Sequence, residues 1–528
     1  MLIFLSGATV PTQILAQSYR IEYDFVESSS PWITSKNPIG LKDLDSLFIS
    51  DINAYFSKAN GGLVNYHQSD NSYQFGGQAR SLYRIHKNVV LKGSLVYSNF
   101  FGRNMSGSAF IDPYYHLFNI TEIDDKNKGN KKLECYHLIG GIAIDLNKGF
   151  SMGAEFDFTA GNSTKMKDLR YIGKITDITA TIGIGQNIAD FIDIGLAYHY
   201  NKNIEGLAFN KYSPTAETFE MLISYGSFWG ERHTFDSALG VLSSRETPML
   251  NFINGGTLQF SLQQTPYFML YAQAGVYFRK GQFNLESTSS PVYYFNNSMK
   301  YDANIAMVIK DKKKNVHRTD LSFNYENGSN FENIWKKVTD KDGGNYIENI
   351  DRKRTNINTK FELRLNHNTK LEVKNNSCKW DLNLGLGAKK LSSDAIIFPY
   401  TRSKEHLLID ALAGGRYNFT HKLHTISGFF YAGYSFGLGE PFTDDSYTDS
   451  PTQITPSTSE LFLNREYEYL CSPKLLFNPK IQYTRAFVKQ KFSTYVALDY
   501  KQNLALSSVE YLTSGMQMNI QLSIGFIL

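Results

Sequence analysis

Apolar and polar side chains alternate along much of this chain, and the alternation is most regular at its C-terminal end. The apolar positions there are Met516, Met518, Ile520, Leu522, Ile524, Phe526 and Leu528, with polar or small residues between them. Because successive side chains of a β-strand point to opposite faces, this pattern predicts a strand with one apolar and one polar face. A tilted strand of about 9 to 11 residues crosses a bilayer, so we interpret the segment as a membrane-crossing strand.

The same period of two recurs in five other segments. These are residues 151–160, 192–200, 357–365, 382–388 and 492–500. A single segment of this kind could belong to a soluble sheet with one solvated face. Many of them together favour a closed barrel, because hydrocarbon tolerates no unpaired strand edge.

Short and long polar connections separate the predicted strands. The short links fall at residues 86–88, 147–149, 186–187, 265–266, 420–422 and 488–490, and the long ones at about 103–133, 162–174, 281–299, 327–352 and 439–467. In outer-membrane barrels the short turns face the periplasm and the long loops face outward, so both termini are expected in the periplasm. The pattern predicts an up-and-down antiparallel barrel of about eighteen strands, within a range of sixteen to twenty. Residues 226–251 fit either one long loop or a loop with a hairpin.

Composition indicates strands rather than helices in the membrane. No apolar run of eighteen residues follows the start, and the mean hydropathy of −0.32 excludes a bundle of transmembrane helices. The 34 Tyr and 37 Phe against 14 Pro suit many strands with aromatic girdles, although a large secreted all-β protein such as a propeller is the alternative. Cys135, Cys378 and Cys471 give neither a disulfide framework nor metal-ligand spacing, and a net charge of +4 is too small to indicate nucleic-acid binding.

The N-terminal region divides into two predicted parts before a barrel of residues 46–528. Residues 1–16 are apolar and end in Leu15-Ala16, which predicts a signal peptide. The usual Lys or Arg before its apolar region is missing, so an upstream start or a buried N-terminal strand stays open. Residues 17–45 are predicted to lie in the periplasm or in the lumen. They are far fewer than the plug domain of an energised receptor contains, and the chain is short for such a plug with about 22 strands.

Two short motifs lie in residues 17–45. One ends in Pro31-Trp32, after three serines, and the other reads Asn37-Pro38-Ile39-Gly40-Leu41. With the barrel pattern and the length of the chain, they resemble an outer-membrane β-barrel family of Bacteroidota that carries a domain-of-unknown-function label. The second motif is also similar to the Asn-Pro-Ala-Gly-Leu start of long-chain fatty-acid transporter-like barrels, with Ile39 in place of Ala. Asn-Pro and Gly are equally ordinary loop residues.

The last strand resembles the closing strand of bacterial outer-membrane barrels, which holds their insertion signal. The resemblance implies that Phe526 and Leu528 are read by the barrel-assembly machinery, although such strands usually end on an aromatic residue and this one ends on Leu528. It also implies outer-membrane lipid as a partner and the Gram-negative outer membrane as the location.

Residue patterns for catalysis or metal binding are weak. His199 is the nearest candidate for a catalytic base, but a lone histidine on a polar strand face is usually just a solvated side chain. The sequence has no Gly-x-Ser-x-Gly or His-Glu-x-x-His motif and no phosphate-binding loop, so we expect no enzyme activity and no cofactor. Asp444, Asp445 and Asp449 lack the spacing of a dedicated Ca²⁺ site and suit a solvated outer loop.

Charged residues on the polar strand faces are the better functional candidates. The predicted lumen-lining residues are Glu155, Asp157, Asp193, His199, Lys360, Glu362 and Arg364. Such charges either line an aqueous path or pair with one another to brace the interior, and the sequence leaves both open. The function predicted is passage of a small solute across the outer membrane. The alternatives are a structural or partner-binding barrel with a blocked lumen and, third, a barrel-type hydrolase.

Overall fold

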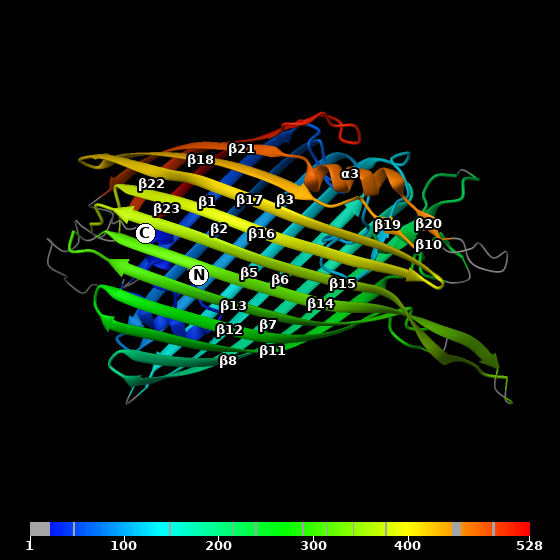
Figure 1. Ribbon diagram of the computed structural model, residues 1–528, viewed down its shortest axis with the longest axis horizontal. Coiled ribbons are helices and arrows are strands. Elements are labelled where there is room, and N and C mark those ends of the chain that lie inside the picture. The colour runs from blue at the N-terminus through cyan, green and yellow to red at the C-terminus, as the bar shows by residue number, and fades with distance from the viewer. Residues whose placement is uncertain are drawn as a thin grey trace.

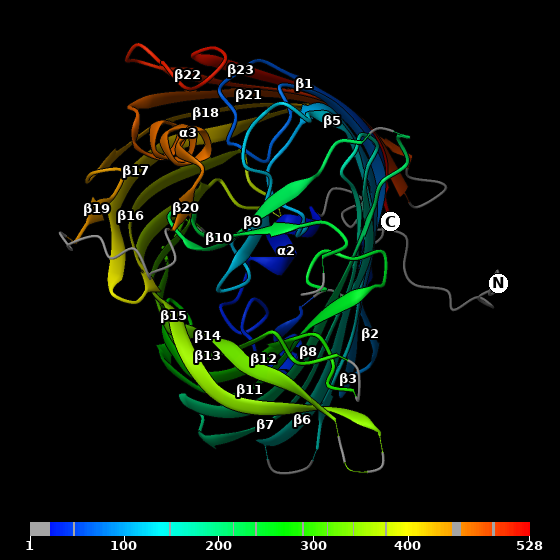
Figure 2. The same cartoon turned by 90° about the vertical axis from the view of Figure 1, so that its right-hand side faces the viewer.

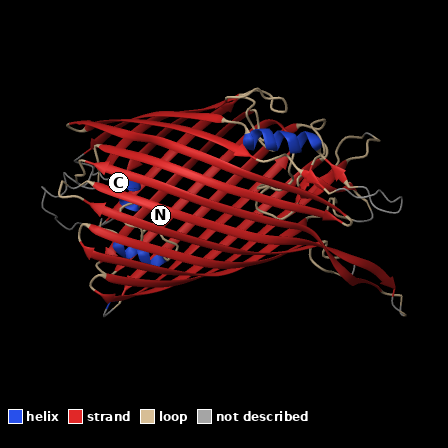
Figure 3. Cartoon of the chain, viewed as in Figure 1, coloured by secondary structure: helices blue, strands red, loops and turns tan. Residues whose placement is uncertain are grey.

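The computed structural model is an 18-stranded antiparallel β-barrel (Figures 1 and 3). It describes residues 22–45, 48–146, 149–214, 216–237, 240–287, 290–313, 315–339, 341, 343–374, 377–445, 456–487 and 492–528. The barrel strands are β1 (Phe48–Asn60), β2 (Asn71–His86), β3 (Val89–Met105), β5 (Gly129–Asp145), β6 (Phe150–Lys165), β7 (Arg170–Ala189), β8 (Ile192–Asn210), β11 (Thr247–Thr265), β12 (Phe268–Phe283), β13 (Tyr294–Lys310), β14 (Val316–Thr339), β15 (Asn345–Leu371), β16 (Trp380–Ile397), β17 (Tyr400–His421), β18 (His424–Leu438), β21 (Lys474–Phe487), β22 (Phe492–Ala505) and β23 (Met516–Ile527). The predicted fold class and strand number are confirmed.

The barrel closes where the first and last strands pair. The β1–β23 ladder runs antiparallel from Asn60 opposite Met518 to Asp51 opposite Ile527. Closure leaves no barrel strand with an unpaired edge, which is the condition for a β-structure in hydrocarbon. The backbone groups of Leu528 continue this seam, because they exchange hydrogen bonds with those of Ser50 at 2.9 and 3.0 Å.

The wall has an apolar outer face and a polar inner face. On β23, Leu522 is 54% exposed and lies between Phe56 of β1, at 51%, and Leu498 of β22, at 47%. The residues between these positions face the lumen. Large apolar side chains left exposed in neighbouring rows are the expected surface toward lipid.

The two ends of the barrel differ in their connections. At one end, which also holds the C-terminus, turns such as the one from β2 to β3 are short; at the other, β3–β5, β8–β11 and β18–β21 are joined by long segments (Figure 1). Two predicted long loops are wrong. Residues 162–174 and 327–352 are mostly strand, because β6 ends at Lys165 and β7 begins at Arg170, while β14 and β15 extend as a hairpin. Strands made mostly of polar residues can still pair with each other where they extend beyond the membrane.

One predicted short link is also misplaced. Residues 186–187 lie inside β7, and the turn to β8 follows Ala189, because an irregularity in register after Asn187 extends the strand. The predicted links at 147–149 and 488–490 lie partly or wholly outside the described residues.

A second sheet lies at the long-loop end of the barrel (Figure 2). Its strands are β4 (Asn119–Thr121), β9 (Glu220–Gly226), β10 (Trp229–Thr234) and β20 (Ser457–Thr458). Helix α3 (Glu460–Cys471) follows β20, and the two-residue strand β19 (Thr443–Asp444) adds to β17. Of the two readings of residues 226–251, the structure has the hairpin, which begins earlier, at Glu220. None of the helices in the described residues is long and apolar enough to cross a membrane.

Candidate functional site in the lumen

Residues 22–45, which we call the inner barrier, lie inside the barrel toward the short-turn end (Figures 2 and 3). They form helix α2 (Tyr23–Glu27) and the 3-10 helix η2 (Pro38–Asp43). Asn37 starts η2, because its side chain accepts the N–H of Ile39 at 3.2 Å. Pro38 occupies the first position of the helix, where its missing N–H removes no hydrogen bond.

Glycines on the inner face of the wall make room for the inner barrier. A Cβ atom on Gly183 of β7 would overlap the side-chain oxygen of Asn37, and one on Gly195 of β8 would lie 2.9 Å from Asn37 Nδ2. A Cβ on Gly153 of β6 would lie 2.9 Å from the Ile39 nitrogen. Only glycine permits so close an approach of two chain segments, so these residues form a seat for the Asn37-Pro38 motif.

Trp32 anchors the inner barrier next to this seat. Its ring is 1% exposed, and its Nε1 donates a hydrogen bond of 3.0 Å to Ser261 Oγ of β11. The ring meets Tyr271 of β12 edge to face at 5.3 Å. The nearby Asn37 Nδ2 donates to Gln259 Oε1 at 2.9 Å, so β11 binds both motif residues through uncharged polar groups.

Ion pairs join the inner barrier to strands far apart around the wall. Glu22 lies 2.5 Å from Arg416 of β17, and Lys36 lies 2.5 Å from Asp302 of β13. Burial raises the pKa of Glu22 against the effect of Arg416, and burial lowers the pKa of Lys36 against the effect of Asp302. Burial therefore disfavours each charged form, and removing one partner would leave the other charge uncompensated.

A third ionic contact involves Arg80 of β2. Its guanidinium lies 3.0 Å from Asp24 and 3.8 Å from Glu27 of the inner barrier, and 3.0 Å from Asp51 of β1. It also covers the ring of Tyr23 at 4.4 Å. Arg80 thus binds α2 to the seam region of the barrel.

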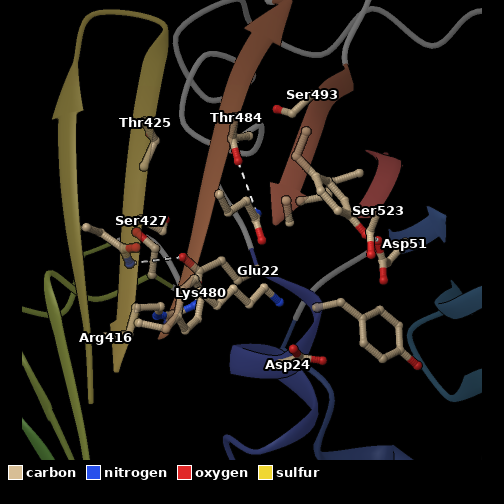
Figure 4. A pocket seen from close by; sticks show the side chains of 18 of the residues that line it. Glu22, Asp24, Asp51, Arg416, Thr425, Ser427, Lys480, Thr484, Ser493 and Ser523 are labelled. Carbon is tan, nitrogen blue, oxygen red and sulfur yellow. Dashed lines mark hydrogen bonds and ion pairs between the residues drawn. The ribbon is translucent and has the colours of Figure 1, made fainter. Parts of the chain in front are cut away.

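A cavity of about 780 Å³ lies between α2 and the wall strands β1, β2, β17, β18 and β21–β23 (Figure 4). Figure 4 shows Glu22 and Asp24 of the inner barrier facing wall residues such as Ser427, Thr484 and Ser523. Its wall presents mainly amides and hydroxyls, with Tyr55, Tyr495 and Phe429 among them. The amide and hydroxyl residues of the wall include Asn53, Gln74, Gln78, Thr425, Ser427, Gln482, Thr484, Gln521 and Ser523. Of the charged residues in the lining, Arg80 and Arg416 are paired with acidic side chains, and Lys480 of β21 lies 5.0 Å from the ring centre of Phe429.

Residues 106–128, hairpin β9–β10 and helix α3 lie within the long-loop end of the barrel, and we call them the outer barrier (Figure 2). Lumen-facing side chains of three distant strands hold residues 106–128: Glu205 of β8 accepts the N–H of Ile111 at 2.6 Å, and Arg279 of β12 and Lys360 of β15 donate to the carbonyls of Tyr115 and Tyr114 at 2.8 and 2.7 Å. An apolar core packs below them. It contains Phe110, Phe118, Ile120, Ile223, Tyr225 and Trp229 with wall residues such as Phe209, Phe283 and Ile397.

Helix α3 fastens the outer barrier through two charged contacts. Arg465 lies 2.5 Å from Asp125, and Glu466 lies 2.7 Å from Lys404 of β17 while it accepts the Tyr114 hydroxyl at 2.8 Å. Burial would raise the pKa of Asp125, but the hydrogen bonds from Arg465 and Lys128 outweigh it and lower this pKa. Both contacts require ionised carboxylates.

The predicted acidic residues face the lumen, and each has a partner there. Glu155 pairs with Lys92 at 3.0 Å, and Asp157 contacts His137 at 2.7 Å. Asp193 lies 3.4 Å from Lys42 of the inner barrier. The contact of Asp193 joins a predicted residue to the inner barrier.

The other predicted lumen residues are also engaged. His199 is 8% exposed and lies 3.0 Å from both Thr181 and Thr257. Lys360 belongs to the outer barrier contacts described above, and Arg364 lies 3.6 Å from Glu362 and 3.3 Å from Asp410. These contacts brace the wall and the outer barrier, and among the described residues the hydrogen-bond partners of His199 are the two threonine hydroxyls.

The remaining predicted motif residues have clear positions. Pro31 is buried next to Trp32, and a Cβ on Gly40 would overlap the Trp32 carbonyl oxygen, so the motif glycine allows η2 to fold back on the tryptophan. Phe526 and Leu528 are 45% and 43% exposed on the outer face of the closing strand. Their role as an insertion signal stays a prediction, as does the signal peptide at residues 1–16, which lies outside the described residues.

The wall residues that hold the inner barrier could not be predicted from the sequence. Ser261, Asp302 and Arg416 each stand alone in their strands, and the seat glycines occupy ordinary positions of a polar strand face. Gly183 and Gly185 lie two positions apart in β7, and this spacing was the one sequence feature that could indicate the seat. Within the described residues no group of three His, Cys, Asp or Glu side chains could hold a metal ion, and all three cysteines are free.

Comparison with known proteins shows the family of the chain. Residues 38–528 match the family described as "Family of unknown function (DUF6850)", and the chain belongs to it. No curated protein matches the sequence. The chain is similar to the solved structure of the ferric preacinetobactin receptor BauA of Acinetobacter baumannii, at 9% identity and a TM-score of 0.39 over 91% of this chain and 80% of that one.

Two further solved structures show a similar degree of likeness. The alcaligin outer-membrane receptor FauA of Bordetella pertussis is 9% identical with a TM-score of 0.40, over 90% of this chain and 76% of that one. The toluene transporter TodX of Pseudomonas putida is 9% identical with a TM-score of 0.29, over 97% and 94%.

Proposed function

We propose that this family member lies in the Gram-negative outer membrane and mediates gated passage of a small, uncharged, hydrophilic solute. The observation that supports the proposal most is the cavity of about 780 Å³ beside the inner barrier. An 18-stranded barrel encloses more space than its own side chains fill, and here part of that space is occupied by chain segments that are not strands of the wall. A barrel with a purely structural role needs no polar cavity of this size.

The contacts of the inner barrier suit a gate. Ion pairs and hydrogen bonds to Arg80, Ser261, Asp302 and Arg416 can be exchanged for water, while the wall stays closed through its own backbone ladder. Release of residues 22–36 would extend the cavity across the lumen. The outer barrier has a comparable set of exchangeable contacts at Asp125 and Glu466.

The lining indicates the class of solute. Amide and hydroxyl groups interleaved with tyrosines hydrogen-bond an uncharged polar molecule, and Lys480 can donate to an acceptor oxygen of the same molecule, while Arg80 and Arg416 are already paired with acids. The same lining suits a fatty-acid chain poorly. The two motifs at Pro31-Trp32 and at residues 37–41, together with the barrel pattern and the length of the chain, support a Bacteroidota species as the source of the protein, and the proposed function includes no catalytic step.

Planar-bilayer conductance tests the proposal. We compare the full chain, a chain lacking residues 19–36, the outer-barrier variant Arg465→Glu, and the two changes combined. The full chain should conduct little, and the combined variant should conduct most, because contacts that hold both barriers are then removed. Heat-modifiable gel mobility reports that each barrel is folded.

A charge exchange provides the matched control for the inner barrier. Lys36→Asp and Asp302→Lys should each raise the frequency of openings in the Arg465→Glu background, because each places like charges together. The exchange of both residues should return it toward the parent value.

A structural barrel with a blocked lumen is the second candidate, supported by the apolar core of the outer barrier. If every folded variant is electrically silent, including the combined one, the passage proposal fails and the structural role is preferred.

A further inference from the structure

Four cations that have no acidic partner among the described residues lie on the outer face of the wall at its long-loop end. They are Lys202 of β8, Lys280 of β12, and Arg352 and Arg354 of β15. The alternation of the strands assigns the outer face: Lys202 follows exposed Tyr198 and Tyr200, and Lys280 follows exposed Val276 and Phe278. Within the described residues none of the four forms an ion pair.

Three of these cations lie over phenylalanine rings, and Lys280 stands beside one of these phenylalanines in the strand ladder. Phe252 of β11 stands opposite Lys202 on one side and opposite Lys280 on the other, with the Lys202 Nζ 5.9 Å from its ring centre. Arg352 lies 3.8 Å from the ring centre of Phe295, and Arg354 lies 5.5 Å from that of Phe331.

Strand pairing makes these residues one patch. Phe295 of β13 stands opposite Phe331 of β14, which in turn stands opposite Arg354. Lys280 stands opposite Asn297, two residues from Phe295 on the same face. Neighbouring strands lie about 4.8 Å apart, so the two lysines are separated by about 10 Å at the backbone, within reach of a common ligand.

The patch lies at the border of the apolar band. Phe278 is 50% exposed, Ile305 48% and Leu321 40%, and these residues continue the same strands toward the short-turn end. A ligand of the patch can therefore present acyl chains to this band and an anionic group to the cations. Cations held over aromatic rings keep their donors free for an anion.

Two other outward cations at this end have acidic partners, whereas Lys132 of β5, over the ring of Phe101, has none among the described residues. Lys174 of β7 lies 2.7 Å from Glu246, and Lys390 of β16 lies 2.8 Å from Glu405. Near the patch, Asp351 accepts the backbone N–H of Arg352 at 2.7 Å and is the adjacent carboxylate in the strand. A nearby carboxylate can thus neutralise an outward cation in place of a ligand. None of the four patch cations has such a carboxylate partner among the described residues.

We propose that the patch of Lys202, Lys280, Arg352 and Arg354 binds the phosphate groups of an outer-leaflet glycolipid, with its acyl chains on the apolar band below. The two lysines flanking Phe252 and the two arginines over Phe295 and Phe331 form two cationic pairs, which suit a headgroup with two phosphates. Arginine and lysine bind phosphate through charge-assisted hydrogen bonds. The inference requires the barrel to be oriented with its long loops outward, and it holds whether or not the lumen conducts.

Native mass spectrometry of the folded full chain in detergent tests this. The probes are diphosphoryl lipid A, monophosphoryl lipid A and phosphatidylcholine. We expect retention in that order, and the fraction retained should fall as salt rises from about 0.1 M to about 1 M, over which the Debye length falls from about 10 to about 3 Å.

Two double variants locate the site. Lys202→Gln with Lys280→Gln, and Arg352→Gln with Arg354→Gln, should each weaken binding of diphosphoryl lipid A about tenfold, which corresponds to about 1.4 kcal/mol. The control, Lys174→Gln with Lys390→Gln, removes two outward cations that have acidic partners and should leave binding unchanged. Heat-modifiable mobility shows that each variant is folded.

The outcome that overturns the proposal is binding that does not depend on these residues or on phosphate. Equal retention of monophosphoryl and diphosphoryl lipid A would show that the patch does not recognise two phosphate groups. Equal loss in the Lys174 and Lys390 control would mean that general surface charge, and no defined patch, attracts the lipid.

Discussion

The side-chain amide of Asn37 occupies the space in which a side chain at Gly183 would stand. The two residues are far apart in the sequence, and the contact places the turn before η2 directly on strand β7. The seat makes the position of the inner barrier depend on the absence of a single methyl group. The contact therefore depends on the size of the side chain at position 183 more than on its charge.

Gly183→Ala should displace the inner barrier without unfolding the barrel. Overpacking of this kind costs about 1 to 3 kcal/mol, which is enough to shift a docked segment but little compared with the closed ladder. We expect faster tryptic cleavage after Lys36 and Lys42 in the folded variant. Gly140→Ala is the matched control, because a Cβ there meets nothing within 4 Å. Identical cleavage of both variants would show that the seat does not hold the barrier.

Sequence alone could predict the wall but not what holds the barrier. Alternation from Met516 to Leu528 follows from lipid on one side and water on the other, so it is visible in one strand. The partners of Trp32 and Asn37 are Ser261, Gln259 and Gly183, and only strand register and closure bring them together. Periodicity contains no such information.

At the long-loop end, the polar composition of the chain led to a wrong prediction of a loop. Residues 327–352 are polar and were expected to form a loop, yet β14 and β15 pair there through Val338 opposite Tyr346. Outside the membrane a polar hairpin satisfies its backbone as well as a loop does. Helix α3 was not predicted either, because its polar residues, such as Arg465 and Glu466, face partners that belong to other segments.

Leu522→Arg should impair assembly, whereas Gln521→Arg should have little effect. Leu522 lies in a row of exposed apolar side chains with Phe56 and Leu498, where an Arg near the bilayer midplane costs roughly 2 to 4 kcal/mol. Gln521 faces the inner cavity, which has room for a longer polar side chain. The amount of heat-modifiable folded barrel in outer-membrane fractions is the measurement. Equal loss in both variants would mean that the faces of β23 are misassigned.

Thiol labelling should show the orientation of the barrel. In a chain whose three native cysteines are replaced, Gly344→Cys at the tip of hairpin β14–β15 should react with a membrane-impermeant maleimide on intact cells. His421→Cys, at the turn between β17 and β18, should react only after the outer membrane is opened. Both positions are exposed, so the substitutions disturb little buried structure. The reverse order of labelling would invert the orientation and remove the basis for a glycolipid at the cationic patch.

Acid should tighten the inner barrier through Asp43. Burial raises the pKa of Asp43 to about 6, against the effects of a 2.7 Å hydrogen bond from Ser30 and the charge of Lys42, while Asp193 and Asp45 add to the increase. When the barrier is released, the pKa of this carboxyl returns to about 3.9. A pKa that is higher in the docked state means that docking is strongest when Asp43 is protonated, below about pH 4, and weakens as pH rises toward 6.

We therefore expect fewer channel openings and slower tryptic release at pH 4.5 than at pH 7.5 in the Arg465→Glu background. Each unit of pKa difference corresponds to about a tenfold change in docking. Asp43→Asn keeps a hydrogen-bonding group and should reduce this pH dependence; Glu22 and Glu27, whose pKa values burial also raises, would account for what is left. Asp190→Asn, at an exposed position in the turn between β7 and β8, is the control. If acid instead releases the barrier, the ion pairs to Arg80 and Arg416 dominate its docking, and Asp43 is not the group that sets the pH response.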